Sequence, residues 1–165
     1  MLKSFQKSLT KLISLITLMS LVTSCGFQLR GSYEVPAFLK NICMDSRGDK
    51  LLRVEVKEQL VIGGINIDNP ALCARLSIID DKLERRTLSL FPNGQVAEYE
   101  LIYSVVYLIE IGESQPRRFS VEILRDYQDN PDAVLAKNRE MNLILKEMRK
   151  DAASRIVRQL ASIRY

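Results

Sequence analysis

An alternating apolar run in the middle of the chain constrains the fold more than any other feature. Residues 96–111 carry a large apolar side chain at every second position, as expected of a strand that buries one face. The residues of this face are Tyr99, Leu101, Tyr103, Val105, Tyr107, Ile109 and Ile111. The opposite face is also apolar at its centre, at Ile102, Val106 and Leu108. Either a helix of the same chain covers that second face as a further core layer, or a partner does.

Two more strands flank this run. Residues 75–90 alternate imperfectly and end at Asn93-Gly94, a pair that readily adopts the positive φ of a tight hairpin. Residues 112–116 supply a second turn, and alternation resumes over residues 117–127. The three strands are therefore predicted to form an antiparallel meander.

A helix is expected on each side of the meander in sequence. Residues 40–46 suggest a short strand, and a helix follows over residues 50–61 with Asp49 as its N-cap. Apolar residues recur there every four positions, although alternation around Val54 also permits a strand. A long helix begins at Asn130-Pro131-Asp132, and its apolar stripe is Met141, Leu145, Met148, Ala152, Ile156, Leu160 and Ile163. This order predicts an α/β two-layer sandwich, with helices packed on a mostly antiparallel sheet.

The N-terminus has the pattern of a secretory signal. Lys3, Lys7 and Lys11 precede an apolar run, and only 13 residues separate Lys11 from Cys25, fewer than the roughly 20 of a membrane-spanning helix. Residues 22–25, Val-Thr-Ser-Cys, resemble the bacterial lipobox. That resemblance implies a signal peptide over residues 1–24, acylation of Cys25, and a lipidated leader over residues 25–39 before a single domain over residues 40–165. Glycine rather than aspartate at position 26 favours sorting to the outer membrane.

Two further cysteines, Cys43 and Cys73, lie in apolar segments. An oxidising compartment permits a disulfide between them if their segments are adjacent. Two buried free thiols are the alternative, which we favour. The spacing alone does not decide between the two.

Composition excludes most catalytic classes. The chain has no His, which rules out serine–histidine nucleophiles, histidine-ligated zinc and histidine pH switches. It has 24 basic and 20 acidic side chains, and removing the three lysines of the signal leaves 21 basic ones, too small an excess for a general nucleic-acid binder. No phosphate loop or metal motif is present in the sequence. We therefore expect a protein that is not an enzyme and needs no cofactor.

Basic side chains are the remaining candidates for ligand binding. Arg85 and Arg86 lie late in the first meander strand, and Lys137 lies in the first turns of the long helix. Lys137 is unusual because it precedes Met141 by four residues and so falls on the apolar stripe. Either its ammonium group reaches past the end of the core to water, or it faces a phosphate.

Short segments along the whole mature chain resemble the LPS-assembly lipoprotein LptE family. They occur in the family's order and spacing: Cys25-Gly26-Phe27-Gln28-Leu29-Arg30-Gly31, Asn93-Gly94-Gln95 with Glu98-Tyr99, Asp129-Asn130-Pro131, Leu135-Ala136-Lys137, Lys146-Glu147-Met148 and Ser162-Ile163-Arg164. The resemblance implies two helices packed on a four-stranded sheet and a role without catalysis. It further implies an outer-membrane lipoprotein on the periplasmic side, which plugs the lumen of the β-barrel LptD, assists its assembly and binds lipopolysaccharide.

The same resemblance makes Lys137 a lipopolysaccharide contact, since it falls in the matching Leu-Ala-Lys segment. A basic residue can precede the Asn-Gly turn in the family, but Pro92 stands there in this chain. Arg85 and Arg86 are the candidates to replace it. Two alternatives remain: a periplasm-facing lipoprotein that binds or carries a glycolipid without a barrel, and a small envelope hydrolase, which the missing histidine disfavours.

Overall fold

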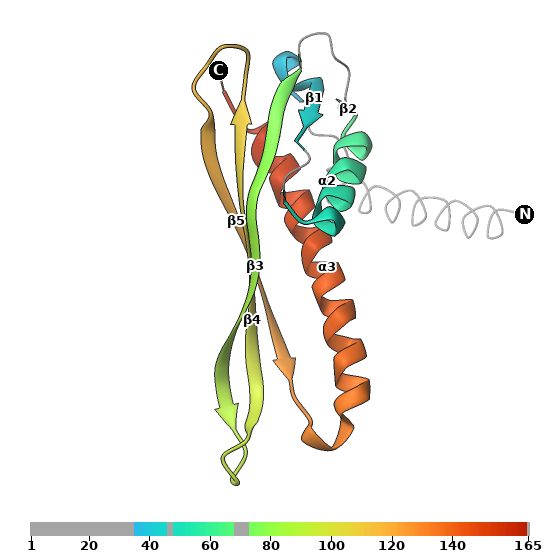
Figure 1. Ribbon diagram of the computed structural model, residues 1–165, viewed down its shortest axis with the longest axis vertical. Coiled ribbons are helices and arrows are strands. Elements are labelled where there is room, and N and C mark those ends of the chain that lie inside the picture. Colours follow the sequence, from blue (N-terminus) through green and yellow to red (C-terminus); the bar gives the residue numbers. More distant parts are fainter. Residues whose placement is uncertain (1–34, 46–47, 68–72, 165) are drawn as a thin grey trace, which may run out of the picture. The chain divides into compact units, whose positions relative to one another are not determined.

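The computed structural model of the protein describes residues 35–45, 48–67 and 73–164, so Cys25 and the predicted signal lie outside it. Two α-helices pack on one side of a five-stranded sheet of order β2-β1-β3-β4-β5 (Figure 1). The predicted two-layer α/β sandwich is confirmed. The elements, with two short 3₁₀ helices η1 and η2, are η1 Ala37–Leu39, β1 Asn41–Met44, α2 Lys50–Ile62, β2 Asn66–Ile67, β3 Ala74–Leu90, β4 Val96–Glu110, β5 Arg117–Gln128, η2 Pro131–Ala133 and α3 Val134–Ala161.

The predicted antiparallel meander is formed by β3, β4 and β5. The sheet has one strand more than the four predicted, because β2 adds a parallel partner to β1. This strand has only two residues, Asn66 and Ile67, too few to show alternation in a sequence. The side-chain amide of Asn66 donates to the Asn41 side chain at 3.1 Å. The sheet is therefore mixed, although its long strands are antiparallel.

Residues 50–62 form a helix, so the strand alternative for this segment is wrong. The Asp49 carboxylate accepts a hydrogen bond from the Leu52 N–H at 3.2 Å, as an N-cap does. Leu52, Val56 and Leu60 are fully buried. A Cβ at Gly63 would lie 3.4 Å from a methyl carbon of Val157 in α3. The helix therefore ends where its backbone passes close to its neighbour.

The long helix α3 begins later than its cap suggested, because the cap opens a 3₁₀ turn first. Asn130 accepts a hydrogen bond from the Asp132 N–H at 3.0 Å, and the α-helix starts at Val134. Most of the predicted apolar stripe is buried, with Leu145 only half-buried. Ala153 and Val157 are buried as well. A single stripe did not predict these two, because α3 packs against both the sheet and α2.

The two faces of β4 have different environments. The predicted core face is buried from Leu101 to Ile111, while Tyr99 is half-buried. Both α-helices lie on that side of the sheet (Figure 1). Ile102, Val106 and Leu108 point to the other side and keep intermediate exposure. The expectation of a second core layer under a helix of this chain is therefore wrong for the part of the chain that the structure describes.

Cys43 and Cys73 form a disulfide, so the preference for free thiols is wrong. Their Cα atoms lie 5.5 Å apart. The physical reason is the parallel pairing of β1 with the first residues of β3, which sets Cys43 opposite Arg75, two residues after Cys73. Local sequence gave no sign of this pairing, because it joins segments on either side of a helix.

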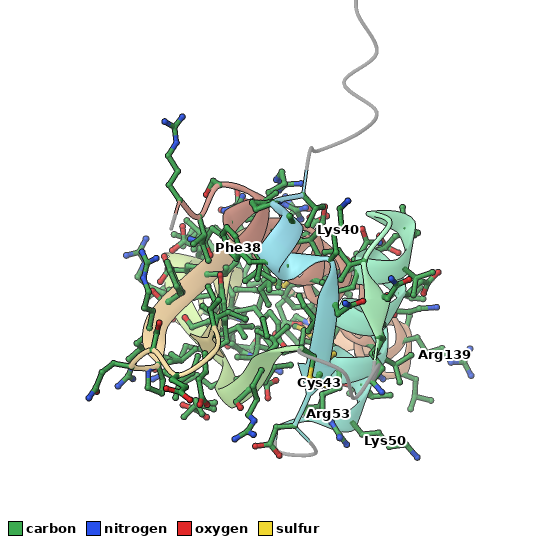
Figure 2. All side chains as sticks on the ribbon, turned by 90° about the horizontal axis from the view of Figure 1, so that it is seen from above. Phe38, Lys40, Cys43, Lys50, Arg53 and Arg139 are labelled. Carbon is green, nitrogen blue, oxygen red and sulfur yellow. A yellow bond between two sulfur atoms is a disulfide. The ribbon has the colours of Figure 1, made fainter. Side chains whose placement is uncertain are left out.

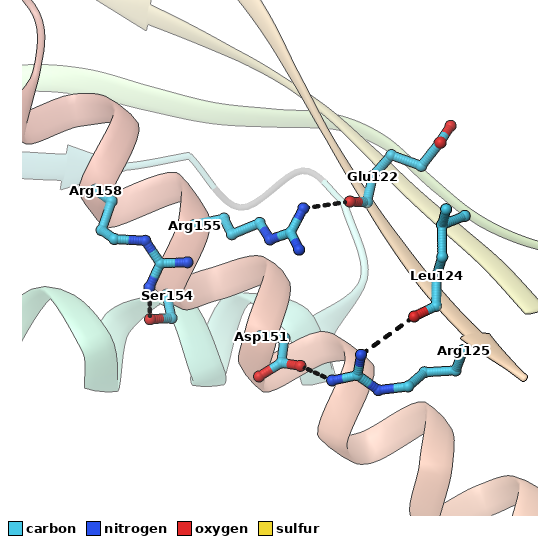
Figure 3. A network of polar contacts seen from close by, with 7 residues as sticks. All are labelled: Glu122, Leu124, Arg125, Asp151, Ser154, Arg155 and Arg158. Carbon is cyan, nitrogen blue, oxygen red and sulfur yellow. Dashed lines mark hydrogen bonds and ion pairs between the residues drawn. The ribbon is translucent and has the colours of Figure 1, made fainter.

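Side chains of α3 and of β5 itself occupy the outer edge of β5 (Figure 3). Arg155 donates to the Glu122 carbonyl at 2.9 Å, and Arg125 bridges the Leu124 carbonyl and the Asp151 carboxylate. Such contacts satisfy backbone groups that would otherwise pair with another strand. Part of this edge is therefore already occupied by side chains of the same chain. No helix among the described residues is long and apolar enough to cross a membrane.

Candidate functional site: a hollow at the start of helix α3

A hollow of about 480 Å³ opens between the β3–β4 turn, the end of β5 and the first turns of α3. Phe91 and Gln95 close the turn by a backbone hydrogen bond of 2.8 Å, and Gly94 holds the positive φ predicted for Asn-Gly. Three segments distant in sequence thus meet at one end of the sheet. The hollow is lined by Arg85, Gly94, Gln95, Val96, Tyr127, Asp129, Asn130, Pro131, Val134, Lys137, Asn138 and Met141.

Lys137 lies against an aromatic ring inside this hollow. Its Nζ lies 4.5 Å from the centre of the Tyr127 ring, in cation–π geometry. The same Nζ contacts a carboxylate oxygen of Glu140 at 2.7 Å. Only 15% of the Lys137 side chain is exposed, against 48% of the Glu140 side chain. The ammonium group therefore stays inside the hollow, which disagrees with a lysine that reaches past the core into bulk water.

Tyr127 fixes the helix as well as the ammonium group. Its hydroxyl donates to the Lys137 carbonyl at 3.2 Å, and the side chain is 4% exposed. Burial raises the pKa of Tyr127, while the charge of Lys137 opposes that rise. The phenol therefore stays neutral at physiological pH and holds the first turns of α3 on the end of β5.

Arg85 joins Lys137 in the hollow because of a β-bulge. The β3–β4 pairing shifts between Ile78 and Asp80, which leaves Ile79 without a partner residue. Before the bulge, even-numbered residues of β3 face the helices; after it, Arg85 is opposite Leu101, a core residue of β4. The extra residue thus turns Arg85 toward the helix side.

Arg86 lies on the other face of the sheet. It is opposite Glu100 in the β3–β4 register and contacts that carboxylate at 2.5 Å. Its side chain is 65% exposed. Of the three basic residues predicted to contact ligand, the structure therefore brings together Lys137 and Arg85 and separates Arg86 from them.

A second hollow of about 700 Å³ adjoins the first and shares Lys137. Phe91 and Pro92 line it from the turn, and Asp129 and Asp132 from the segment before α3. Pro92 contributes an apolar wall where the resemblance implies a basic side chain. The positive charge of the site therefore comes from Lys137 and Arg85 alone, with two carboxylates at the rim.

Tyr127 and Glu140 were not predicted as part of the site. Both had signals in the sequence. Tyr127 ends the alternation of residues 117–127, so it belongs to the buried face of β5. Glu140 lies three residues after Lys137, the spacing at which side chains of a helix meet. Neither signal identified a site until the start of α3 was placed over the end of β5.

The two cations in the lining of the hollow have the chemistry of an anion contact, with the Asp129 carboxylate in the same lining. Lys137 supplies a point charge and Arg85 a planar fork, the two groups that proteins use for phosphate. Among the described residues, no group of three or more Cys, Asp or Glu could hold a metal ion.

Comparison with known proteins decides the family. The model of the LptE family, described as lipopolysaccharide-assembly, matches residues 33–160. The chain belongs to the LptE family. It is similar to the LPS-assembly lipoprotein LptE of Photorhabdus laumondii, with 36% identity over 160 residues that cover 94% of this chain and 86% of the relative. The LPS-assembly lipoprotein LptE of Pectobacterium atrosepticum is 34% identical over 148 residues, covering 87% of this chain and 80% of that protein.

Solved structures agree with this membership. The rare lipoprotein B of Shewanella oneidensis superposes with a TM-score of 0.67 at 44% identity, covering 74% of this chain and 94% of that one. An uncharacterised lipoprotein B of Nitrosomonas europaea shares the fold, with a TM-score of 0.65 at 24% identity. The LptE family is a family of lipopolysaccharide-assembly lipoproteins, and the prediction that the chain is not an enzyme is confirmed by this membership.

Proposed function

We propose that the chain is a lipid-anchored plug of the β-barrel LptD at the outer membrane and contacts lipopolysaccharide phosphate through Lys137 and Arg85. Family membership supports a role in lipopolysaccharide assembly. The barrel partner, the membrane location and the contact residues go beyond what family membership shows. The observation that best supports a protein partner is the uncovered face of the sheet, which is the side that carries Ile102, Val106 and Leu108.

That face has the character of a surface that meets an enclosing partner. Ile102, Val106 and Leu108 lie along its centre, between charged residues such as Glu98 and Glu110 at the strand ends. A barrel lumen is polar but enclosed, so it accommodates a face of mixed character that water alone does not favour. The edge of β5 offers less to a partner, because its Glu122 carbonyl is bonded to Arg155 of α3 and its Leu124 carbonyl to the neighbouring Arg125 side chain.

The hollow at the start of α3 supports the glycolipid contact. Lys137 is held by Tyr127 and by one half-exposed carboxylate, Glu140. An ion pair of this exposure contributes little free energy in water, so a phosphate competes with it at low cost. Arg85 lines the same hollow and adds the second positive charge.

The anchor is proposed from the sequence. Cys25 follows the residues of a lipobox, and acyl chains at this position would hold the domain at a membrane. Two or more chains give stable anchoring, because each buried methylene contributes about 0.8 kcal/mol. Cys25 lies outside the described residues, so this part of the proposal depends on the sequence alone.

Site-specific photo-cross-linking in cells tests the barrel contact. A photoreactive amino acid at Val106, on the uncovered face, is expected to form a cross-link with one large outer-membrane protein. The matched position is Val105, buried on the helix side, which is expected to give none. Absence of a cross-link from Val106, with the protein correctly folded and localised, would contradict the plug.

A further inference from the structure

A third hollow, of about 370 Å³, lies between β5 and the last turns of α3. Residues 120–122 of β5 line one side of it, and Arg155, Arg158, Gln159 and Ser162 line the other. We call it the Arg155 hollow. Its positive charge comes from the two arginines, which are both exposed. Neither arginine lines the two hollows described above, so the third hollow is a separate feature of the surface.

The hydrogen bonds of the two arginines go to neutral acceptors. Arg155 donates to the Glu122 carbonyl at 2.9 Å, and Arg158 donates to the Ser154 hydroxyl at 2.8 Å (Figure 3). Among the residues that the structure describes, neither arginine has an ion pair with a carboxylate. A guanidinium group has five N–H donors, so each arginine keeps donors and an uncompensated charge for a ligand.

The carboxylate of Glu122, the acidic residue in the lining, points away from the hollow. Glu122 falls on the uncovered face of the sheet in the β4–β5 register, while the neighbouring Val121 is buried on the helix side. Figure 3 shows the Glu122 carboxylate directed away from α3 and from Arg155. Asp151, one turn before Arg155, is paired with Arg125. The charge presented to the hollow is therefore positive.

Contacts within the chain hold the wall between the arginines and β5. The hydroxyl of the fully buried Tyr107 donates to the Gln159 side chain at 2.9 Å. The Ser162 hydroxyl donates to the Gln159 carbonyl at 2.7 Å. The bond from Arg155 to β5 fixes one guanidinium group on this wall. Guanidinium forks match the oxygen atoms of phosphate, and groups that are already held lose little further freedom on binding.

The Arg155 hollow has the same kind of charge as the hollow at the start of α3, farther along the same helix. Lys137 precedes Arg155 by 18 residues, which is five turns of an α-helix and about 27 Å of its axis. Both therefore lie on the side of α3 that contacts β5. The last turns of α3 lie at the end of the domain that carries η1 (Figure 1), and Figure 2 looks onto that end, with Phe38 and Lys40 labelled.

We propose that the Arg155 hollow is a second anion site, which binds a phosphate group of a glycolipid through both guanidinium groups. The inference rests on the proposed function for the identity of the glycolipid, lipopolysaccharide, which carries several phosphate groups. The two sites then take different phosphate groups, one at each end of α3. The hollow lies on the helix side of β5, so the barrel contact proposed at the uncovered face does not use these arginines.

The test measures the affinity of the tagged, mature protein for purified lipopolysaccharide in detergent, by capture of the protein and quantification of the retained glycolipid. The Arg155→Gln, Arg158→Gln double variant is expected to bind at least several-fold more weakly than the parent. Arg118→Gln is the matched control, because Arg118 is an exposed arginine of β5 on the uncovered face, opposite Leu108, and it is expected to bind like the parent. With enzymatically dephosphorylated lipopolysaccharide, the parent and the double variant are expected to bind equally.

Lys137→Gln in the same titration separates this inference from the proposed function. Weaker binding by Lys137→Gln, with parent-like binding by the double variant, would overturn the second site and leave the proposed contact intact. Weaker binding by the double variant alone would support the Arg155 hollow and remove Lys137 from the proposed function. Weaker binding by both is the result that the two proposals together predict.

Two further results would overturn the second site. An equal loss of affinity for dephosphorylated lipopolysaccharide would exclude a phosphate contact. A lower yield of a co-purifying barrel, with unchanged affinity for lipopolysaccharide, would assign the arginines to carboxylates of a protein partner. Urea unfolding of each variant measures its stability. If the double variant is unstable, Arg158→Gln alone carries the test, because Arg158 is bonded only to Ser154 of its own helix among the described residues.

Discussion

The Nζ of Lys137 lies 4.5 Å from the centre of the Tyr127 ring, while the Tyr127 hydroxyl donates to the Lys137 carbonyl. Tyr127 thus contacts both the backbone carbonyl and the charged amino group of Lys137. The arrangement fixes the start of α3 on the end of β5 and keeps the cation inside the hollow. A cation held in this way loses little further freedom when an anion binds.

Lys137→Glu is expected to weaken lipopolysaccharide binding by on the order of tenfold or more, the loss of one charge-assisted hydrogen bond. The substitution also removes the contact of Nζ with the Tyr127 ring and places a carboxylate three residues before Glu140, so the free energy of unfolding of the variant is measured beside its binding. Fluorescence titration with purified lipopolysaccharide measures the dissociation constant. An unchanged constant, with an unchanged circular dichroism spectrum, would remove Lys137 from the site.

Arg85→Gln and Arg86→Gln form a matched pair. They test whether the β-bulge at Ile79 places Arg85, and not Arg86, at the bound ligand. Both substitutions remove one charge from adjacent, exposed positions, but only Arg85 lines the hollow. Arg85→Gln is expected to weaken lipopolysaccharide binding several-fold, and Arg86→Gln is expected to leave it unchanged. Equal effects in the same titration would mean that the phosphate contact is not confined to the hollow.

Removing the disulfide is expected to lower the free energy of unfolding. Cys43 and Cys73 are 30 residues apart, and closing a loop of that length stabilises the folded state by roughly 3–4 kcal/mol. Urea unfolding of the Cys43→Ser, Cys73→Ser double variant measures the loss. The parent protein under reducing conditions is the control and should show a similar loss. No difference between the oxidised and reduced parent would contradict a stabilising role.

The buried tyrosines predict a loss of stability at high pH. Burial raises the pKa of Tyr107, whose hydroxyl donates to the Gln159 side chain at 2.9 Å, above its ordinary value. The folded state therefore keeps a proton that the unfolded state loses above about pH 10, so stability falls as pH rises past that point. Urea unfolding across this range should show a flatter decline for Tyr107→Phe than for the parent. Parallel curves would mean that this hydroxyl does not carry the effect.

Cys25→Ala is expected to abolish acylation and to leave the unprocessed precursor at the inner membrane. Membrane fractionation with metabolic labelling by a fatty-acid analogue measures both. Cys43→Ser is the control, since it changes a cysteine that the fold pairs with Cys73. A processed Cys25→Ala protein that still fractionates with the outer membrane would disprove the anchor.

The sequence predicted the fold where the signals were local. Alternation gave the meander, and the caps Asp49 and Asn130 placed both helices correctly within a few residues. It failed where pairing joins distant segments. The two-residue strand β2 depends on parallel pairing with β1, and so does the disulfide, because both require segments separated by α2 to lie side by side.

The candidate site was likewise predictable where its signals were local, and not where they depended on strand pairing. Lys137 was predicted because a charged residue interrupts an apolar stripe, which is a local signal. Arg85 and Arg86 were not distinguished, because a one-residue bulge at Ile79 exchanges the faces of residues 80–87 in β3. The imperfect alternation of that strand was the trace of the bulge in the sequence.

The central claim is a stable complex with one outer-membrane β-barrel. The most direct test is an affinity purification of the tagged, full-length protein from detergent-solubilised outer membrane, with partners identified and quantified by mass spectrometry. The account predicts LptD in a one-to-one ratio, and a reduced yield when Val106 on the uncovered face is changed to Lys. Recovery of the protein without a barrel, alone or with lipid only, would contradict it.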